Sequence, residues 1–507
     1  MTRTWLGVVG ITLVIGTVAC HTDSITDANR NPNDPTSAPP GALFTNATIT
    51  SVRRWTGFGS AAVLAQHFSS VLYPTVDTYA TLQASNTNGT FTSTYTNDLA
   101  DFRQVVQAGK ASGQPGIYGP AMVLMTWDFS NLTDQWGDIP YSEALQADSG
   151  IVTPKYDAQK DIYDDIFAKL SQAANDMAAV PAGAPTLGAS DPIYDGDLGK
   201  WRRFANSLRA RHAMRITNVD ITKADMELHA AFDDPGGVFQ SNDDNAKVDW
   251  PGDGIYDNPF AAGVKSRLDV RVARTLTDLM DGDPRLPVFA MPVVDSSVYS
   301  GGYGGEPSGL TPDSAGQWFR LASWPGAIFG PGVTSYGTYG TADGLKTPSY
   351  IMTYSELLFL RAEAAERGLG GLSSGEAADD YYAAIRASME QWGVTDEGAI
   401  ATFLARPEIA YKGGDDGLEQ IAVQKWIALF SVSYQVWAEW RRTCQPETVA
   451  PGPAAIVPYV PRRFYYSTTE ALVNAENLNA AIGRQGPDDF GTRIWWDSKP
   501  ENAPTCH

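Results

Sequence analysis

Two adjacent helix-forming segments constrain the fold of this chain more than any other feature. The first, TYSELLFLRAEAAERG, covers 353–368, and the second, SSGEAADDYYAAIRASMEQWG, covers 373–393. Gly368 suits a C-terminal helix cap, and Ser373 with Glu376 has the spacing of a capping box. Small side chains would let two antiparallel helices approach closely, at Ala362, Ala365, Ala378 and Ala384. These segments therefore predict two packed helices joined by a short turn.

Further amphipathic segments indicate that most of the chain is helical. Apolar residues recur at spacings of three and four in 157–178, in 203–218 and in a long segment from about 418 to 441. Helix pairs are also plausible at roughly 115–178 and 200–235. Because no strict 34-residue repeat can be laid along the chain, any repeat must be degenerate. The predicted fold class is mostly α, a tetratricopeptide-like helical-pair scaffold with long irregular loop insertions.

Two stretches between the helices have a different composition. Residues 73–98 are crowded with Thr, Ser, Asn and Tyr, and residues from about 294 to 345 are rich in Gly, Tyr, Ser and Trp. The second shows no helical periodicity, and we predict both to be long loops. Long loops inside a compact protein tend to be functional or mobile. We therefore expect the binding site in these two regions.

The N-terminal residues have the features of a secretion signal. Arg3 precedes an apolar stretch from Trp5 to Val18, which is too short for a comfortable bilayer span. The small residues before Cys20 make this segment similar to the bacterial lipobox, in which the thiol is acylated. We expect residues 1–19 to be a lipoprotein signal peptide and Cys20 to carry a lipid such as palmitate. The alternative is a soluble signal peptide with an incidental cysteine.

The composition after Cys20 predicts how the exported chain continues. Residues 20–41 are polar and rich in Pro, Asn and Asp, as expected of a flexible tether in front of a domain covering 42–507. Export would place the remaining thiols in an oxidising compartment, where a pair has a reason to close. We therefore predict a disulfide between Cys444 and Cys506 that fixes the C-terminal tail.

The charge balance excludes one class of partner. Acidic residues number 58 against 37 Lys and Arg, which gives a formal net charge of −21. A polyanion would be repelled by this chain overall. Nucleic acid is therefore not expected as a partner.

Several sequence blocks follow one another in a defined order along the chain. They are LTDQWGDIPYSEAL at 132–145, TPKYDAQKDIYDDI at 153–166, DPIYDGDLGKWRRFANSLRARHAMRI at 191–216, DPRL at 283–286, QKWIALF at 424–430, VWAEWRR at 436–442 and RIWWD at 493–497. Together with the predicted helical pair and the lipobox, they resemble the SusD/RagB family of nutrient-binding outer-membrane lipoproteins. The resemblance spans nearly the whole mature chain.

The resemblance implies both a location and a partner. A SusD-like protein would be anchored in the outer membrane by its N-terminal lipid, at the cell surface. It would close like a lid over a TonB-dependent, SusC-like transporter. The implied function is capture of a glycan, or of another oligomeric nutrient such as a peptide, and its delivery to that transporter.

No catalytic or metal-binding constellation stands out in the sequence. None of the five His lies in an H-E-x-x-H motif, and no C-x-x-C or phosphate-binding Gly-rich loop occurs. A G-x-S-x-G match at 371–375 falls in the predicted helical turn, whereas a nucleophile elbow follows a strand. Asp249, Asp253 and Asp257 suggest a calcium loop, but Phe260 replaces the required Glu. We therefore expect a binding protein, not an enzyme, with no cofactor and no metal.

Aromatic and amide side chains in the two predicted loops are the candidate ligand contacts. Sugar rings stack their apolar C–H faces on Trp and Tyr, and their hydroxyl groups hydrogen-bond polar side chains. The candidates are Tyr73, Tyr79, Asn86 and Asn88 in the first loop, and Tyr299, Tyr303, Trp318, Trp324 and Tyr336 in the second. The alternative is that these side chains merely pack their own loops. Tryptophans in the helical and family blocks are expected to be structural.

Two other functions remain open at this stage. One is a tetratricopeptide-type scaffold whose groove binds a segment of another protein. The other is a surface glycoside hydrolase, since some pair of carboxylates could have glycosidase spacing, although no residue points to one. Five arginines, Arg202, Arg203, Arg209, Arg211 and Arg215, could form an anion site, but their framework position favours structural ion pairs.

Overall fold

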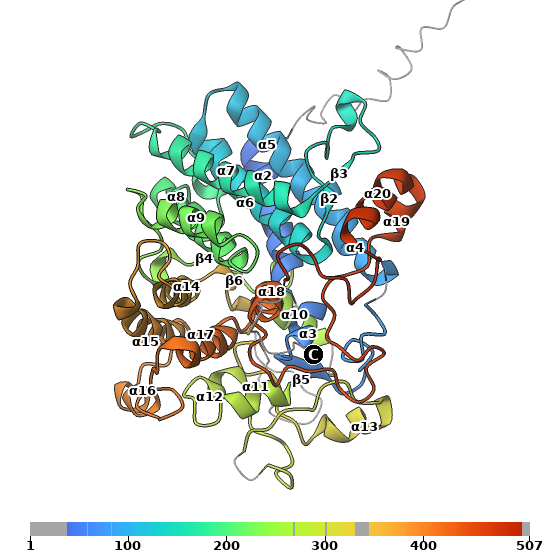
Figure 1. Cartoon of the computed structure of the whole chain (residues 1–507), viewed down its shortest axis with the longest axis vertical. Coiled ribbons are helices and arrows are strands. Elements are labelled where there is room, and N and C mark those ends of the chain that lie inside the picture. Colours follow the sequence, from blue (N-terminus) through green and yellow to red (C-terminus); the bar gives the residue numbers. More distant parts are fainter. Residues whose placement is uncertain are drawn as a thin grey trace, which may run out of the picture. The chain divides into compact units, whose positions relative to one another are not determined.

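A computed structural model describes residues 38–498, except for 58, 83, 267–268, 300–301 and 330–343 (Figure 1). The side chains of 84–86 and 265–266 are also not described. The compact unit begins at Pro40. The predicted signal peptide, Cys20, residues 20–37 of the predicted tether, Tyr336 and Cys506 all lie outside the described residues.

The described part of the chain is mostly helical, as predicted. Helices that follow one another in the first half pack side by side, namely α2 (Pro40–Thr56), α5 (Ala100–Ala111), α6 (Pro115–Trp136), α7 (Gln159–Ala178), α8 (Leu198–Arg215) and α9 (Ile221–Phe232). A second group comprises α14 (Tyr354–Arg367), α15 (Ser374–Gln391), α16 (Glu397–Leu404), α17 (Gly414–Ala428) and α18 (Ser433–Thr443). The apolar stripe predicted in 157–178 is buried along α7, which explains why that segment folds as a helix.

The helical pair predicted at 353–393 is confirmed by α14 and α15, which lie side by side (Figure 1). Gly368 ends α14 in the left-handed conformation, with φ of 65°. Ser373 and Glu376 form the capping box that begins α15. Ala362, Ala365 and Ala384 are fully buried, as close helix packing requires. The G-x-S-x-G match therefore joins two helices, and its Ser373 serves as a helix cap.

Short elements connect the helical groups. Three antiparallel strand pairs occur in the described residues, β1 (Phe68–Ser70) with β5 (Val270–Val272), β2 (Ile139–Pro140) with β3 (Tyr156–Asp157), and β4 (Ala246–Val248) with β6 (Ser349–Met352). The short helices are α3 (Ser60–Leu64), α4 (Ala84–Ser93), α10 (Pro259–Ser266), α11 (Arg274–Leu279), α12 (Leu286–Phe289), α13 (Pro312–Gly316), α19 (Thr468–Val473) and α20 (Ala475–Gln485). The remaining turns are a π-helix, η1 (Thr94–Leu99), and the 3-10 turns η2 (Ala147–Ser149), η3 (Gly188–Ser190), η4 (Asn242–Asp244), η5 (Gln317–Phe319) and η6 (Gly344–Lys346).

Two sequence predictions about local structure need correction. The segment from about 418 to 441 is interrupted after Ala428, and Ser431 has a φ of 77°, which no helix interior allows. The break buries Leu429 and Phe430 in the core, so tertiary packing outweighs the helical pattern. The first predicted loop is helical from residue 84 onward, where α4 and η1 occur.

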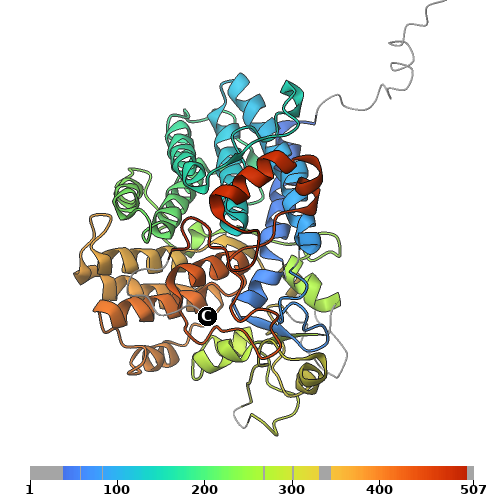
Figure 2. The same cartoon turned by 45° about the vertical axis from the view of Figure 1, so that its right-hand side comes forward.

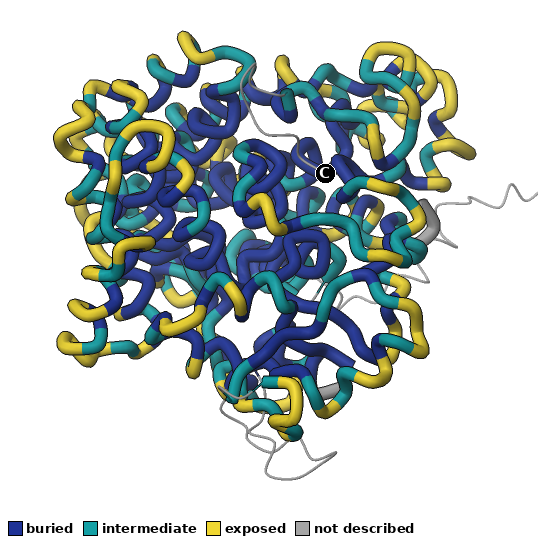
Figure 3. Tube along the Cα trace, turned by 60° about the horizontal axis from the view of Figure 1, so that its bottom comes forward, coloured by how far each residue is buried: buried dark blue, intermediate teal, exposed yellow. Residues whose placement is uncertain are grey.

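The interior is filled by the residues that the helical pattern marks as apolar (Figure 3). The tryptophans expected to be structural are buried, namely Trp127, Trp136, Trp201, Trp392, Trp426, Trp437, Trp440 and Trp496. Trp495 is partly buried, with its ring 5.7 Å from that of Tyr163. None of the described helices is both long and apolar enough to span a bilayer.

Arginine side chains join the helices through ion pairs. Each of the five arginines between Arg202 and Arg215 contacts a carboxylate, which confirms their structural role. Arg211 of α8 contacts Glu356 of α14 with a nitrogen–oxygen distance of 2.6 Å, and both are buried. A second buried cluster, here called the ionic cluster, consists of Glu363 in α14, Lys425 in α17, and Glu439 and Arg442 in α18. These ion pairs fix the helices relative to one another.

Candidate ligand-binding site

The two predicted loop regions meet around the β1–β5 strand pair. Glu306 N–H donates to the carbonyl of Val272 (3.0 Å), and Arg274 N–H donates back to the carbonyl of Glu306 (2.8 Å). Val272 N–H donates to the carbonyl of Ser323 (2.9 Å). Residues near 68, 306 and 323 are therefore held together by β5. Figure 2 shows the early segment that contains β1 beside the insertion that follows residue 294.

An aromatic and cationic cluster lies where the chain leaves β5. We call Arg274, Tyr299 and Trp318 the aromatic ledge. The Arg274 guanidinium carbon lies 4.9 Å from the centre of the Trp318 ring, and Arg274 Nε donates to the Tyr299 hydroxyl (3.2 Å). That hydroxyl donates to the carbonyl of Gly305 (2.8 Å). Tyr299 and Trp318 are both partly exposed, so the ledge combines a fixed orientation with access to solvent.

The ledge borders a cavity of about 360 Å³. Arg274 belongs to its lining, together with Gln66, Thr275, Asp278, Leu279, Pro307, Ser308, Thr448 and Ala450. The lining contains amide, hydroxyl, carboxylate and guanidinium groups, which can all hydrogen-bond a hydroxylated ligand. The volume lies in the lower part of the range for small-molecule sites, about 300–1,000 Å³.

Tyr73 is the most exposed of the predicted aromatic contacts among the described residues, and it follows the end of the β1–β5 pair that is opposite Arg274. Its side chain is 61% exposed, and its N–H donates to the Ser70 hydroxyl (3.2 Å). In the antiparallel pair, His67 bonds Ala273 near Arg274, whereas Val71 bonds Asp269 at the opposite end. Tyr73 therefore follows the end of β1 that lies farther from Arg274.

Two predicted contact residues are buried, in contrast to the expectation that they face a ligand. Tyr79 is 3% exposed, and the ring of Trp324, also 3% exposed, lies 3.6 Å from the guanidinium carbon of Arg271. The Phe319 ring, 4.5 Å away, provides a second aromatic contact for that buried guanidinium. Tyr303 packs against the core as a partly buried side chain. The buried guanidinium of Arg271 on β5 thus holds Trp324 in the interior. No local sequence pattern indicates this contact.

Asn88 has a structural contact instead of a free position in a loop. It lies in α4, where its amide nitrogen donates to the Thr468 hydroxyl (2.6 Å) and its amide oxygen accepts from Thr468 N–H (2.8 Å). Both contacts are made at the first residue of α19. The side chain of Asn86 is not described, and Tyr336 lies outside the described residues.

A buried carboxyl group lies beneath this site that the sequence does not single out. Glu306 is fully buried and is bonded through its backbone to β5. Burial, reinforced by the Asp77 carboxylate and by Asp269, raises the pKa of Glu306 well above its ordinary value of 4.5, and Arg271 offsets only part of this effect. Burial therefore favours the protonated form of this carboxyl group.

The Glu306→Gln variant is expected to gain stability relative to the natural protein as the pH rises above 4.5. Above that value the unfolded state releases a proton that the folded state retains, so the free energy of unfolding of the natural protein falls with pH. An amide of the same shape has no such dependence. Urea denaturation midpoints at pH 5 and pH 8 measure the difference, with Glu419→Gln, an exposed position, as the control. If the urea midpoints of all three proteins changed equally between pH 5 and pH 8, the raised pKa of Glu306 would be contradicted.

Residues 32–467 match the SusD-like family described as "Starch-binding associating with outer membrane". The match covers most of the chain. The chain belongs to the SusD-like family. This membership confirms the resemblance found in the ordered sequence blocks.

Solved structures agree with the SusD-like assignment. A protein named "chitin-binding protein" is 27% identical, with a TM-score of 0.77 over 91% of this chain and 100% of its own. A chitin-binding SusD homologue from Flavobacterium johnsoniae is 26% identical, with a TM-score of 0.75 over 92% and 98% of the two chains. A SusD homologue from Bacteroides thetaiotaomicron is 25% identical, with a TM-score of 0.73 over 91% and 100%. The tetratricopeptide-like SusD-like fold is thereby confirmed. None of the curated proteins matches the chain.

Proposed function

We propose that this SusD-like protein binds a neutral glycan on the aromatic ledge and delivers it to an outer-membrane transporter. The observation that carries the proposal is the pair of partly exposed rings, Tyr299 and Trp318, held by Arg274 at the border of a cavity with both polar and apolar lining side chains. The family description and the two chitin-binding structures support a glycan as the ligand class.

The geometry of the ledge suits a sugar ring. A pyranose presents an apolar C–H face, which an aromatic ring can cover, and a rim of hydroxyl groups, which the cavity lining can hydrogen-bond. Because Arg274 fixes Trp318 before a ligand arrives, little side-chain freedom is lost on binding. Tyr73, beyond the far end of β1, would extend the contact only for a long oligomer.

The proposed cellular arrangement follows from the N-terminal sequence and from the family. Residues 1–19 would direct export, Cys20 would carry the lipid, and residues 20–41 would be the tether of the domain at 42–507. The partner would be a TonB-dependent, SusC-like transporter. Cys444 is buried and disulfide-bonded, and we retain Cys506 as its proposed partner.

Binding without turnover is the expected result when the purified protein meets neutral oligosaccharides. Calorimetric titration with chitin-type and starch-type oligomers is expected to give dissociation constants in the micromolar to millimolar range. Chromatography of the same oligomers after long incubation is expected to show no shortened products. The appearance of new reducing ends would favour a hydrolase, and binding of peptides alone would remove the glycan from the proposal.

A further inference from the structure

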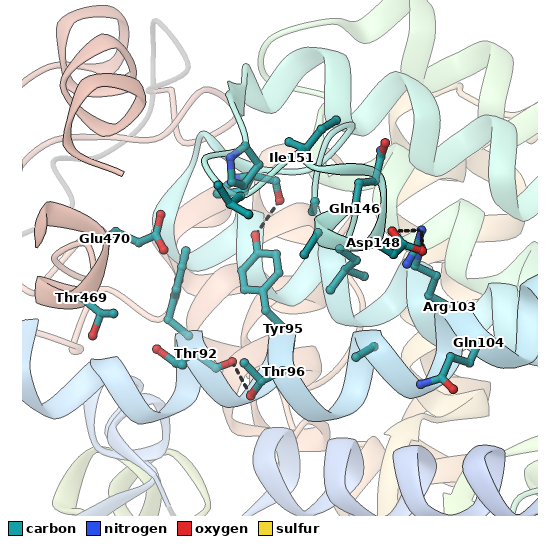
Figure 4. A pocket seen from close by; sticks show the side chains of 18 of the residues that line it. Thr92, Tyr95, Thr96, Arg103, Gln104, Gln146, Asp148, Ile151, Thr469 and Glu470 are labelled. Atoms are coloured by element: carbon teal, nitrogen blue, oxygen red, sulfur yellow. Dashed lines mark hydrogen bonds and ion pairs between the residues drawn. The ribbon is translucent and has the colours of Figure 1, made fainter. Parts of the chain in front are cut away.

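A cleft of about 710 Å³ lies over the π-helix η1, apart from the aromatic ledge. Figure 4 shows it between η1 and α5 on one side, the chain at 140–154 on the other, and the first residues of α19 at one end. Its lining shares no residue with the ledge. The cleft therefore needs an explanation of its own.

The floor of the cleft is aromatic and fixed. The Tyr95 hydroxyl donates to the carbonyl of Pro140 (2.7 Å), so the ring stands across the cleft (Figure 4). The ring of Phe91 lies 5.1 Å from that of Tyr95, and the ring of Phe129, which is not itself part of the lining, lies 6.2 Å from it. The wide π turn is what sets Tyr95 in the cleft while Thr94 and Asp98 stay buried. Single π turns inside helices occur frequently at functional sites.

The opposite wall is aliphatic. It contains Pro140, Ala144, Leu145, Ile151 and Val152. Leu145 has a φ of 64°, a left-handed conformation that is unfavourable for a branched side chain. Such conformations persist where the surrounding structure imposes them, and they cluster at ligand sites. A ligand between the two walls must therefore present apolar groups in both directions.

Each charged group in the lining already has an ionic or hydrogen-bonding partner. Arg103 contacts Asp148 at 3.2 Å, and Figure 4 shows this ion pair at one end of the cleft. At the other end, the Glu470 carboxylate accepts from the Tyr156 hydroxyl (2.8 Å). The net charge of −21 further disfavours an anionic ligand. These contacts favour an uncharged ligand.

The remaining polar groups are amides and hydroxyls. They belong to Thr92, Thr96, Gln104, Gln107, Gln146 and Thr469. A glutamine amide offers both donors and an acceptor, which match the amide of an acetamido group. The methyl of the same group is apolar and suits the aliphatic wall, while a sugar ring can cover Tyr95.

We propose that this cleft is a second carbohydrate site, which binds a neutral N-acetylated sugar unit. The inference rests on the proposed function, because it assigns an acetamido sugar to a glycan-binding protein. It adds a binding position that the aromatic ledge does not include. A glycan chain, or two separate chains, could then be held at two places on one molecule.

Photoaffinity labelling with triacetylchitotriose that carries a diazirine tests this assignment on the full exported domain. Mass spectrometry is expected to find label in two regions, near 299–324 and within 91–107 or 140–154. Ala100→Trp, which fills the cleft, is expected to lose the second label and retain the first. Trp318→Ala is expected to lose the label near 299–324 and to retain the label in the cleft. Thr96→Trp, at an exposed lining position, repeats the test if Ala100→Trp does not fold.

The possible outcomes separate the two proposals. Label near 299–324 alone would overturn the second site and leave the proposed function intact. Label in neither region would count against the glycan function and the cleft together. Displacement of the cleft label by unmodified maltotriose as effectively as by unmodified triacetylchitotriose would overturn the acetamido assignment. Preferential displacement by the acetylated sugar would support it.

Discussion

Replacing Arg442 with methionine is expected to lower the free energy of unfolding by about 3–5 kcal/mol, the usual cost of leaving a buried charge without its partner. Arg442 donates to both carboxylate oxygens of Glu363, at 2.7 and 2.5 Å, and also to Glu439. All three side chains are buried between α14 and α18. Methionine would fill most of the volume but leave the two carboxylates facing each other with less positive charge.

The pKa of Glu363 shows how strongly the neighbouring arginines act on this carboxyl group. Burial alone would raise this pKa, but Arg442 and Arg367 outweigh burial and lower it to about 2. The contribution of this carboxylate to stability is therefore complete above its ordinary pKa of 4.5 and is lost as the pH falls toward 2. In Arg442→Met, the folded-state pKa of Glu363 is expected to rise toward its ordinary value, so this pH-dependent contribution to stability is expected to be smaller.

Urea denaturation followed by tryptophan fluorescence measures both effects. The matched control is Arg386→Met, because Arg386 pairs with Glu397 at the surface, at 2.8 Å. A surface pair contributes only about 0–1 kcal/mol. If both variants lost equally little stability, the buried ionic cluster would not be what fixes α14, α17 and α18 relative to one another.

Replacing Trp318 with alanine is expected to weaken glycan binding roughly 10- to 100-fold, which corresponds to about 1.5–3 kcal/mol for the loss of one fully covered aromatic face. Trp318 is partly exposed, so the folded structure is expected to change little. Trp318→Phe retains a ring and is expected to recover part of the affinity. Calorimetric titration with the best ligand of the oligosaccharide panel measures the change.

Tyr73→Ala is the comparison variant, because it removes an exposed aromatic side chain that does not belong to the ledge. Tyr73 is more exposed than Trp318 but lies beyond the far end of β1. Short oligosaccharides are expected to bind this variant as they bind the natural protein. If the loss at Tyr73 equalled or exceeded the loss at Trp318, the ligand would lie along a different surface from the ledge.

The sequence was sufficient to predict a helix where the residues that determine its ends or its buried face lie within a few positions of one another. The boundaries of α14 and α15 could be predicted because Gly368, Ser373 and Glu376 act on the backbone next to them. The stripe on α7 could be predicted because its residues share one helix face. The ordered sequence blocks then gave the family, which the comparisons confirm.

The candidate site was less predictable because distant residues decide its details. Tyr79 and Trp324 have polar or Gly-rich neighbours in the sequence, yet both are buried, and for Trp324 the cause is Arg271 on β5. The polar stretch from residue 84 forms helices because Phe91, Thr94 and Asp98 pack inward. Arg274 follows β5 in an ordinary helical segment, and no pattern in that segment indicates that it supports Trp318.

The pairing of β1 with β5 makes the ledge depend on chain segments that lie far apart in the sequence. Phe68 is aligned with Val272, and the backbone bonds of Glu306 and Ser323 are added to the same strand. A chain truncated before Val270 cannot assemble the ledge, however well its first helices fold. The ligand affinity that we propose for the ledge would therefore belong only to chains that are complete through this region.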